Sequence, residues 1–237
     1  MEQLIIKKII QIPNSNDELF LKVVGKIYTF LNPVSYLDAL KHKELFEKYD
    51  GIFADGSLLV AAIRTFYGKK VTRRSFDMTS FAPQLFEYAR NNHKSIYIVA
   101  SKQEQVEKAV KIFQERYPDI KIIGFRNGYF HDEEEQMDEA RKIVALSPDF
   151  LIVGMGILMQ ERFLLKVKDA GFNGIGFTCG GFIHQTAKDE IDYYPGWVDR
   201  MNLRFLYRMY KEPHTRIRYF KAGLIFPVRF AWERFFG

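Results

Sequence analysis

The sequence predicts an α/β fold: a Rossmann-like, mostly parallel sheet with helices on both faces, followed by a helical, basic and aromatic C-terminal appendage. Two observations predict it. Short, almost wholly apolar runs alternate with amphipathic segments through residues 1–197, which is typical of strands buried on both faces of a parallel sheet. After residue 197 such runs stop, and residues 198–237 carry nine Arg or Lys against three Asp or Glu, with ten aromatic residues.

Six of the apolar runs are predicted strands. The first two each lead directly into a helix, and Pro33 suits the first turn of the helix after the first strand. Parallel strands need crossover helices between them, so the alternation favours a parallel sheet. The predicted strands span 26–32, 51–55, 95–100, 120–125, 149–156 and 174–181.

Four helices are predicted from apolar residues that recur every three or four positions. In one of them Val106, Ala109 and Val110 share a face, and another begins with acidic residues that suit the positive end of the helix dipole. The tail is also predicted to be helical, with breaks at Pro213 and Pro227, because proline lacks the N–H that a helix interior needs. The four helices are expected at 58–66, 103–117, 133–146 and 160–169.

The composition is that of a globular protein with one large domain or two small ones: 237 residues, 47% of them hydrophobic and 27% charged. The net charge of +6 arises in residues 198–237, since residues 1–197 are neutral. We therefore divide the chain into a domain at 1–197 and a tail at 198–237.

The single Cys179 excludes an internal disulfide and is typical of a reducing compartment; we interpret it as a buried structural thiol. Lys7 and Lys8 interrupt the first apolar run, so we expect no secretory signal peptide. No run approaches the roughly 18 apolar residues of a membrane span, so the protein is expected to be soluble or peripheral.

Asp55 is the first candidate functional residue, because it lies between a predicted strand and a predicted helix, where α/β folds expose functional groups. One interpretation is that it caps the helix, although Ser57 could do so equally well. The other is that a carboxylate beside apolar strands has a raised pKa and acts as a general base. The residues alone leave both interpretations open.

Two further patterns suggest ligand sites. Gly154 and Gly156 follow a strand and precede a helix, as in a phosphate-binding loop, although many α/β turns need glycine for backbone reasons alone. The acidic run at 131–135 suggests a metal site, but the start of a solvated helix explains it better. No Asp-x-Asp pair occurs in the chain, so we expect no metal.

The tail has three interpretations. Its arginines flank an apolar stripe that includes Leu203, Leu206 and Tyr210, and residues 222–232 add an apolar segment too short to span a bilayer. This combination favours an anionic membrane surface, with Phe226, Phe230 and Trp232 at the bilayer interface. A helical lid or oligomer contact is the second interpretation. Nucleic-acid binding is the third and least favoured, and we expect no nucleic-acid partner.

These features together resemble the WecG/TagA/CpsF family of bacterial glycosyltransferases (glycosyltransferase family 26). The resemblance extends from about Asn32 to Arg218. Its motifs are "FLNPVSY", "ADG", "AAIRTFYGKKVTRRSFD", "RYPDIKIIGFRNGYF", "SPDFLIVGMGILMQE", Trp197 and "LRFLYRMYKEP". The sequence departs from the family at Phe30 (commonly Thr), Leu158-Met159 (Pro-Lys), Ile183-His184 (Phe-Asp) and Tyr193-Tyr194-Pro195 (Arg-Ala-Pro).

The resemblance implies an inverting, metal-independent enzyme without a cofactor. Its donor would be a UDP-sugar carrying N-acetylmannosamine, the uronic acid of that sugar or a related hexose. Its acceptor would be a polyprenyl-diphosphate-linked sugar, in the synthesis of a capsule, a teichoic acid or another cell-surface polysaccharide. The protein would be cytoplasmic and peripheral on the inner face of the cell membrane, and a homo-oligomer is possible. The alternative is a non-catalytic nucleotide-sugar-binding scaffold at the membrane.

The resemblance also assigns roles to residues. Asp55 matches the family's general base. Arg208 and Arg218 match family arginines expected near the leaving diphosphate; a third would fall at Thr215, so we expect Arg216 to substitute for it. The full set of expected substrate-binding residues is Asn32, Arg73, Arg74, Gly128, Tyr129, Gly154, Gly156, Gln160, Glu161, Arg208, Arg216 and Arg218.

Overall fold

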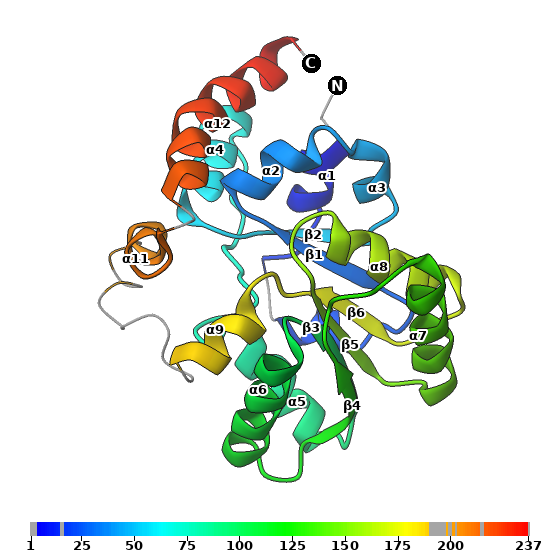
Figure 1. The fold of residues 1–237 in the computed structure, drawn as a ribbon. Coiled ribbons are helices and arrows are strands. Elements are labelled where there is room, and N and C mark those ends of the chain that lie inside the picture. Colours follow the sequence, from blue (N-terminus) through cyan, green and yellow to red (C-terminus); the bar gives the residue numbers. More distant parts are fainter. Residues whose placement is uncertain are drawn as a thin grey trace.

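The computed structural model describes residues 4–14, 17–189, 198, 201, 203–213 and 216–236. Its centre is a six-stranded sheet in the order β2-β1-β6-β5-β3-β4, in which every pair of neighbours is parallel (Figure 1). The strands are β1 (Ile27–Leu31), β2 (Gly51–Ala54), β3 (Ser95–Ala100), β4 (Lys121–Arg126), β5 (Phe150–Gly154) and β6 (Ile175–Thr178). The predicted α/β fold class and all six predicted strands are confirmed.

Helices cover both faces of this sheet because successive strand residues point to opposite sides. In β3, for example, Ile98 packs into the core of one face and Val99 into the core of the other. The first face is covered by η1 (Asp17–Leu21), α5 (Phe81–Asn91), α6 (Gln103–Arg116) and α9 (Phe182–Asp189). The second is covered by α1 (Leu4–Ile10), α2 (Pro33–Ala39), α3 (Lys43–Glu47), α4 (Ser57–Tyr67), α7 (Glu133–Leu146) and α8 (Met159–Asp169). Helix α12 (Arg216–Phe236) packs on α2 and α4. The helix predicted after the first strand is confirmed as α2, with Pro33 as its first residue. The four helices predicted from apolar spacing are confirmed as α4, α6, α7 and α8.

The C-terminal segment forms two helices, α11 (Arg204–Lys211) and α12. The break predicted at Pro213 is confirmed, since α11 ends at Lys211. The break predicted at Pro227 is wrong, because α12 continues through it. The carbonyl that Pro227 leaves without a donor belongs to Gly223, which lies on the exposed face of α12, where water can satisfy it. The buried face of the helix supplies the packing that holds it together.

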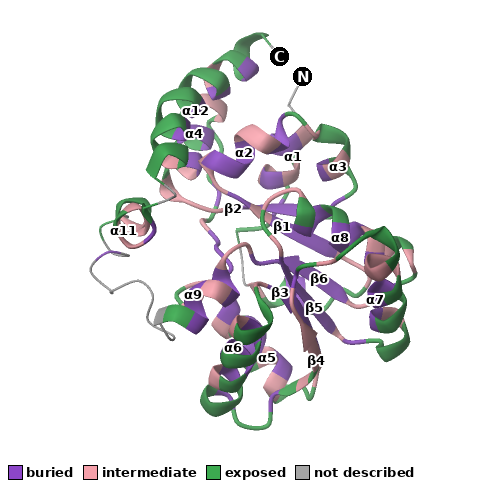
Figure 2. Cartoon of the chain, in the orientation of Figure 1, coloured by how far each residue is buried: buried purple, intermediate pink, exposed green. Residues whose placement is uncertain are grey.

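That buried face corrects a second expectation. Phe226 and Phe230 are almost completely buried and pack against Tyr36 of α2, with Phe230 also against Phe66 of α4. They are therefore part of the protein core and not available to a bilayer. Trp232, by contrast, is 46% exposed. Figure 2 shows this division along α12, with buried residues on its inner face and exposed ones outside.

None of the helices that the structure describes is long and apolar enough to cross a membrane. The division of the chain at residue 197 stays a prediction, because that boundary falls among residues outside the described ranges. Trp197, Thr215 and the family departure at 193–195 also lie outside them.

Candidate active site

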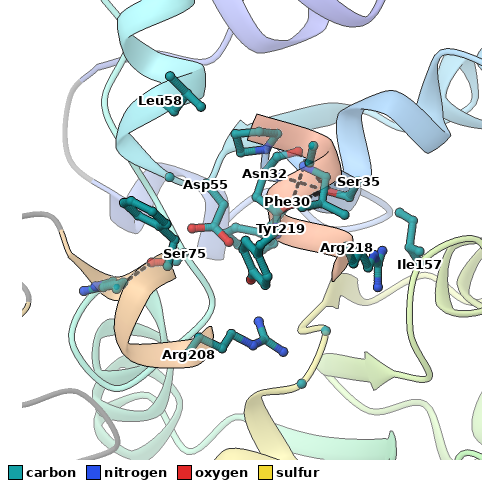
Figure 3. Close-up of a pocket in the computed structure, with 18 of the residues that line it drawn as sticks. Phe30, Asn32, Ser35, Asp55, Leu58, Ser75, Ile157, Arg208, Arg218 and Tyr219 are labelled. Atoms are coloured by element: carbon teal, nitrogen blue, oxygen red, sulfur yellow. Dashed lines mark hydrogen bonds between the residues drawn. The ribbon is translucent and has the colours of Figure 1, made fainter. Parts of the chain in front are cut away.

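A cavity of about 1030 Å³ opens at the carboxyl ends of β2, β1, β6 and β5. Open parallel sheets bind their ligands at this edge, because the loops that follow the strands are free to shape a site there. The turns after these four strands form one side of the cavity, and helices α11 and α12 form the other (Figure 3). The C-terminal segment therefore completes the site.

Asp55 lies in the turn between β2 and α4 and lines the cavity. The cap of α4 is Gly56, whose φ of 93° is the left-handed backbone that favours glycine, and Ser57 is the first helical residue. The carboxylate of Asp55 makes no hydrogen bond within the described part of the chain; only its backbone N–H is bonded, to the carbonyl of Leu31. The helix-cap interpretation of Asp55 is therefore wrong.

The surroundings of Asp55 raise the pKa of its carboxyl group to about 6. Burial is the main cause, because it disfavours the charged form, and the carboxylate of Asp77 adds to the effect. Three arginines act in the opposite direction, namely Arg204, Arg73 and Arg208. A carboxylate with a pKa near neutrality is ionised at pH 7–8 yet basic enough to accept a proton from a reacting group.

An extended segment beside β2 explains how two consecutive arginines diverge. Residues 73–75 run along the end of β2, with a bridge between Ala54 and Arg73 and a hydrogen bond from the Arg74 N–H to the Ala54 carbonyl. Side chains alternate in such a segment. Arg73 and Ser75 therefore line the cavity, whereas Arg74 is buried outside it and pairs with Asp17 at 2.5 Å.

Two arginines reach the cavity from the C-terminal helices. Arg208 of α11 points into the space beside Asp55 and Tyr219 (Figure 3). A side chain on Gly181 would place its Cβ 3.1 Å from a terminal guanidinium nitrogen of Arg208, so the glycine admits the arginine to the turn after β6. Arg218 of α12 lines the cavity and lies 3.5 Å from a carboxylate oxygen of Asp38.

Gln160 and Glu161 are neighbours with different positions: Gln160 lies at the wall of the cavity and Glu161 in the protein interior. Gln160 lines the cavity, and its Oε1 accepts a hydrogen bond from the Gly180 N–H at 3.0 Å. Glu161 is fully buried behind it, where Oε1 accepts hydrogen bonds from Thr29 and Gln160, each at 2.9 Å. Its Oε2 accepts one from the Leu158 N–H at 2.6 Å. Burial raises the pKa of Glu161. The structure thus gives Glu161 a positioning role toward Gln160 and no contact with the cavity.

Asn32 and the two glycines of the predicted phosphate loop have structural roles: Asn32 caps a helix, and the glycines meet backbone or packing requirements. Asn32 lines the cavity, but its Oδ1 caps α2 by accepting hydrogen bonds from Val34 and Ser35, each at 3.0 Å. Gly154 is buried, and a Cβ there would meet the sulfur of Cys179 at 2.7 Å. Gly156 lines the cavity with a φ of 83°.

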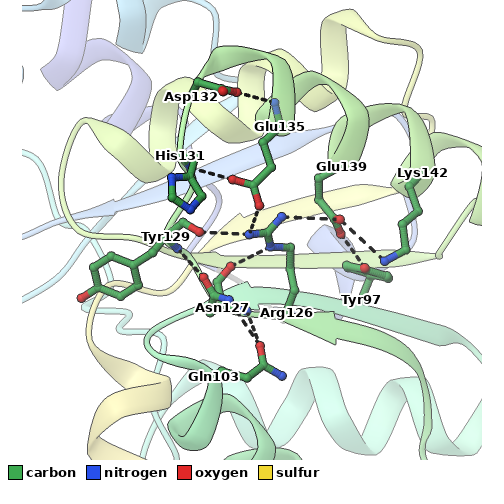
Figure 4. Close-up of polar contacts among 10 residues, drawn as sticks. All are labelled: Tyr97, Gln103, Arg126, Asn127, Tyr129, His131, Asp132, Glu135, Glu139 and Lys142. Carbon is green, nitrogen blue, oxygen red and sulfur yellow. Dashed lines mark hydrogen bonds and ion pairs between the residues drawn. The ribbon is translucent and has the colours of Figure 1, made fainter.

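The turn that carries Gly128 and Tyr129 is held by polar contacts centred on Arg126 (Figure 4). Arg126 donates hydrogen bonds to the carbonyls of Asn127 and Tyr129, at 2.9 and 3.0 Å, and pairs with Glu135 at 3.1 Å. Gly128 packs over the end of β3, and Tyr129 extends outward with 65% of its surface exposed. These contacts hold the turn in one shape. Neither residue lines the cavity.

The acidic run at 131–135 is confirmed as the start of a helix. Asp132 caps α7 by accepting a hydrogen bond from the Glu135 N–H at 2.8 Å. The carboxylate of Glu135 in turn accepts from the His131 N–H at 2.6 Å and from Arg126.

The predicted site residues therefore fall into two groups. Those that line the cavity are Asn32, Asp55, Arg73, Gly156, Gln160, Arg208 and Arg218. Those outside its lining are Arg74, Gly128, Tyr129, Gly154, Glu161 and Arg216, the last of which donates a hydrogen bond to the Met209 carbonyl. Sequence reasoning missed four lining residues that bear on the site: Ser75, Asp77, Arg204 and Tyr219. Ser75 and Asp77 stand in the "SFD" that ends one family motif, and Arg204 stands in "LRFLYRMYKEP".

A partly buried carboxylate with a raised pKa and several arginines, at the carboxyl edge of a parallel sheet, are groups typical of an enzyme site for an anionic substrate. The comparisons with known proteins specify which kind. Residues 11–237 match the glycosyl transferase WecG/TagA/CpsF family. The chain belongs to this family and is a glycosyltransferase, as the resemblance implied.

Two relatives illustrate the range of the family. The chain is 36% identical to a UDP-Gal:alpha-D-GlcNAc-diphosphoundecaprenol beta-1,4-galactosyltransferase of Shigella boydii, over 93% of this chain and 92% of that protein. It is 24% identical to an N-acetylglucosaminyldiphosphoundecaprenol N-acetyl-beta-D-mannosaminyltransferase of Bacillus subtilis (strain 168), over 80% of this chain and 73% of that one. The two relatives share the type of acceptor and differ in the sugar that they transfer.

Proposed function

We propose that this protein transfers a hexose from a UDP-sugar to N-acetylglucosaminyl-diphosphoundecaprenol, with inversion at the anomeric carbon, in the synthesis of a cell-surface polysaccharide. The observation that carries the proposal is the carboxylate of Asp55, whose pKa is raised to about 6 in a cavity also lined by arginines. Galactose is the first candidate sugar, because the relative at 36% identity is named a galactosyltransferase and those at 24–25% are named N-acetylmannosaminyltransferases.

In the proposed reaction, Asp55 accepts the proton of an acceptor hydroxyl as that oxygen attacks the anomeric carbon. A bond forms between the acceptor oxygen and this carbon, while the bond from the carbon to the UDP oxygen breaks on the opposite face. The departing UDP carries the electron pair of that bond. Arg208, which also pairs with Glu212, and Arg218, which also pairs with Asp38, line the cavity and would neutralise its diphosphate, together with the backbone N–H of Gly181.

We further propose that the reaction needs no divalent cation. Metal-dependent transferases use the ion to stabilise the leaving diphosphate, a role that fixed positive charge can also fill. Four arginines line this cavity, namely Arg73, Arg204, Arg208 and Arg218. The sequence lacks the Asp-x-Asp pair that commonly holds such an ion.

The proposal is tested by incubating the protein with a panel of UDP-sugars and a short-chain GlcNAc-diphosphate lipid, in excess EDTA. We expect transfer from UDP-galactose in preference to UDP-N-acetylmannosamine, with a β-linked product and an unchanged rate when Mg²⁺ or Mn²⁺ replaces EDTA. A retained anomeric configuration would contradict the inverting mechanism. Activity that EDTA abolishes and a metal restores would contradict the electrostatic role of the arginines.

The C-terminal helices supply the second part of the proposal, which is peripheral binding to the inner face of the cell membrane. Five exposed apolar residues recur at helical spacing along α12, and we call them the outer stripe: Ile217, Phe220, Leu224, Val228 and Phe235. Phe220 and Leu224 also line the cavity. Exposed apolar residues of α11 adjoin it, among them Leu206 and Tyr210. Basic residues accompany the stripe, including Lys221 and Arg229. An apolar face with basic flanks is suited to an anionic bilayer surface.

We expect the triple variant Ile217→Ser, Val228→Ser, Phe235→Ser to lose most of its binding to phosphatidylglycerol vesicles. These three residues are 66–72% exposed, so their replacement should not destabilise the fold. The measurement is vesicle co-sedimentation across a salt series, since each basic residue near an anionic surface contributes only about 1 kcal/mol and salt screens it. Leu146→Ser, 44% exposed on α7, is the matched control. Full sedimentation of the triple variant would favour a lid or an oligomer contact instead.

A further inference from the structure

Helix α11 lies over the cavity without any buried residue of its own. Its apolar residues are partly buried at most, as Tyr207 and Met209 are, so polar contacts supply much of what holds this helix in place. The most extensive of these involve Arg204, the first residue of the helix, whose side chain is only 13% exposed.

Arg204 inserts its guanidinium group into the segment between α4 and α5. One terminal nitrogen donates hydrogen bonds to Ser75 Oγ at 2.9 Å and Asp77 Oδ2 at 2.7 Å, and the other donates to Thr79 Oγ1. Asp77 is itself held, because its Oδ1 accepts hydrogen bonds from the N–H and the hydroxyl of Thr79, at 2.9 and 2.8 Å. A charge-assisted hydrogen bond from a guanidinium to a preoriented carboxylate is among the stronger polar contacts in proteins.

The same contact determines where Arg208 lies. Residues four apart occupy one face of a helix, so the face that presents Arg204 to Asp77 presents Arg208 to the cavity. Both arginines and Asp77 line that cavity, and all three act on the charge of Asp55. Docking of α11 thus delivers two positive charges to the neighbourhood of one carboxylate.

We propose that Asp77 and Arg204 are positioning residues, a polar latch that docks α11 on the sheet edge, orients Arg208 in the cavity and determines the charge around Asp55. The inference rests on the proposed function, because the latch positions groups that act on Asp55, the proposed base. Arg204 also adds to the positive charge of the cavity, but its positioning role depends on its contacts with Ser75, Asp77 and Thr79 and needs no contact with substrate.

The latch makes a directional prediction about pH. The ionisable groups that face Asp55 across the cavity are Arg73 and Asp77 from the segment before α5, Cys179 after β6, Arg204 and Arg208 from α11, and Arg218 and Tyr219 from α12. Among the groups that act on Asp55, Asp77 raises its pKa and Arg204 lowers it. Removing the two latch charges one at a time should therefore move the pKa of Asp55 in opposite directions.

The experiment measures kcat/KM against pH, from 5 to 9, with a water-soluble acceptor analogue. For Arg204→Gln we expect kcat/KM at pH 8 to fall by about 10- to 100-fold, the effect of losing a charged hydrogen-bond network. The acidic limb of the profile, where kcat/KM falls as Asp55 becomes protonated, should move to higher pH. For Asp77→Asn we expect a loss at pH 8 as well, but an acidic limb displaced to lower pH. Arg204→Lys keeps the positive charge but cannot contact Ser75, Asp77 and Thr79 together. This variant should therefore have the acidic limb of the unmodified protein but a reduced kcat/KM at pH 8.

Hydrogen exchange of the α11 backbone provides a second readout. Exchange of residues 204–211 should accelerate in Arg204→Gln, and Lys211→Gln on the same helix should retain both the protection and the rate of the unmodified protein. The latch proposal would be overturned if Arg204→Gln and Asp77→Asn both had the kcat/KM profile of the unmodified protein. It would also be overturned if their acidic limbs moved in the same direction. Active Asp55→Asn protein would instead overturn the proposed base, so the two failures are distinguishable.

Discussion

Asp55→Asn is expected to lower turnover by about 10²- to 10⁴-fold, the usual cost of losing a general base. The substitution removes the proton acceptor while keeping the size of the side chain. Because the carboxylate of Asp55 makes no hydrogen bond within the described part of the chain, the variant should lose no structural contact there. The measurement is the initial rate with UDP-galactose and a short-chain lipid acceptor.

The pH dependence of the unmodified enzyme should identify the same group. A base must be ionised to act, so kcat/KM should fall as the pH decreases through about 6, the pKa of Asp55. Asp138→Asn is the matched control, since Asp138 is an exposed carboxylate on α7 that pairs only with Arg141 among the described residues. Near-normal turnover in folded Asp55→Asn protein, or an acidic limb unaffected by the substitution, would contradict the assignment.

As the pH rises through about 6, activity should increase, whereas the contribution of Asp55 to the free energy of unfolding should decrease. The pKa of Asp55 is higher in the folded protein than in the unfolded chain, so its contribution to stability is fully present below about pH 4 and is lost as the pH rises through about 6. Asparagine has no proton to lose. At pH 8 the free energy of unfolding of Asp55→Asn should therefore exceed that of the unmodified protein by at most about 3 kcal/mol, and its melting temperature should be higher. Near pH 4 the two proteins should melt at similar temperatures.

The sequence predicted the parts of the fold that depend on local pattern. Each strand is an apolar run buried by helices on both sides, so its composition alone identified it. The "ADG" turn was predictable for the same reason, because it is a strand end, a carboxylate and the left-handed glycine that allows α4 to begin. Helix α5 was missed although Phe81, Leu85 and Ala89 recur at helical spacing and Pro83 stands in the first turn, where it is tolerated.

Tertiary contacts decided what local pattern could not. Phe226 and Trp232 are similar side chains six residues apart, and only the packing of α12 on α2 shows that one is in the core and the other at the surface. The same packing carries the helix through Pro227. Arg73 and Arg74 are indistinguishable in sequence and diverge because the segment beside β2 is extended. Arg204 and Asp77 are separated by 127 residues, so no sequence pattern pairs them.

Arg208→Ala is expected to reduce kcat by about 10²- to 10³-fold, the usual effect of removing one preorganised group that stabilises charge developing in a transition state. Arg208 is the tail arginine that points into the space beside Asp55, and its side chain is 26% exposed, so its charge is only partly screened by solvent. The loss should appear more in kcat than in KM for the UDP-sugar, because the diphosphate gains negative charge as the glycosidic bond breaks.

Two controls separate this role from a structural one. Arg208→Lys should recover only part of the activity, since an ammonium group cannot make the two parallel contacts of a guanidinium with a diphosphate. Arg216→Ala removes the same side chain from an exposed position outside the cavity lining, where it contacts the Met209 carbonyl, and should retain most turnover. Both alanine variants should still sediment with anionic vesicles, because the outer stripe of α12 is intact in each. Normal turnover of Arg208→Ala, or equal impairment of Arg216→Ala, would contradict this role of Arg208. Positive charge in the C-terminal helices would then act at the membrane surface, and other groups of the cavity would stabilise the leaving diphosphate.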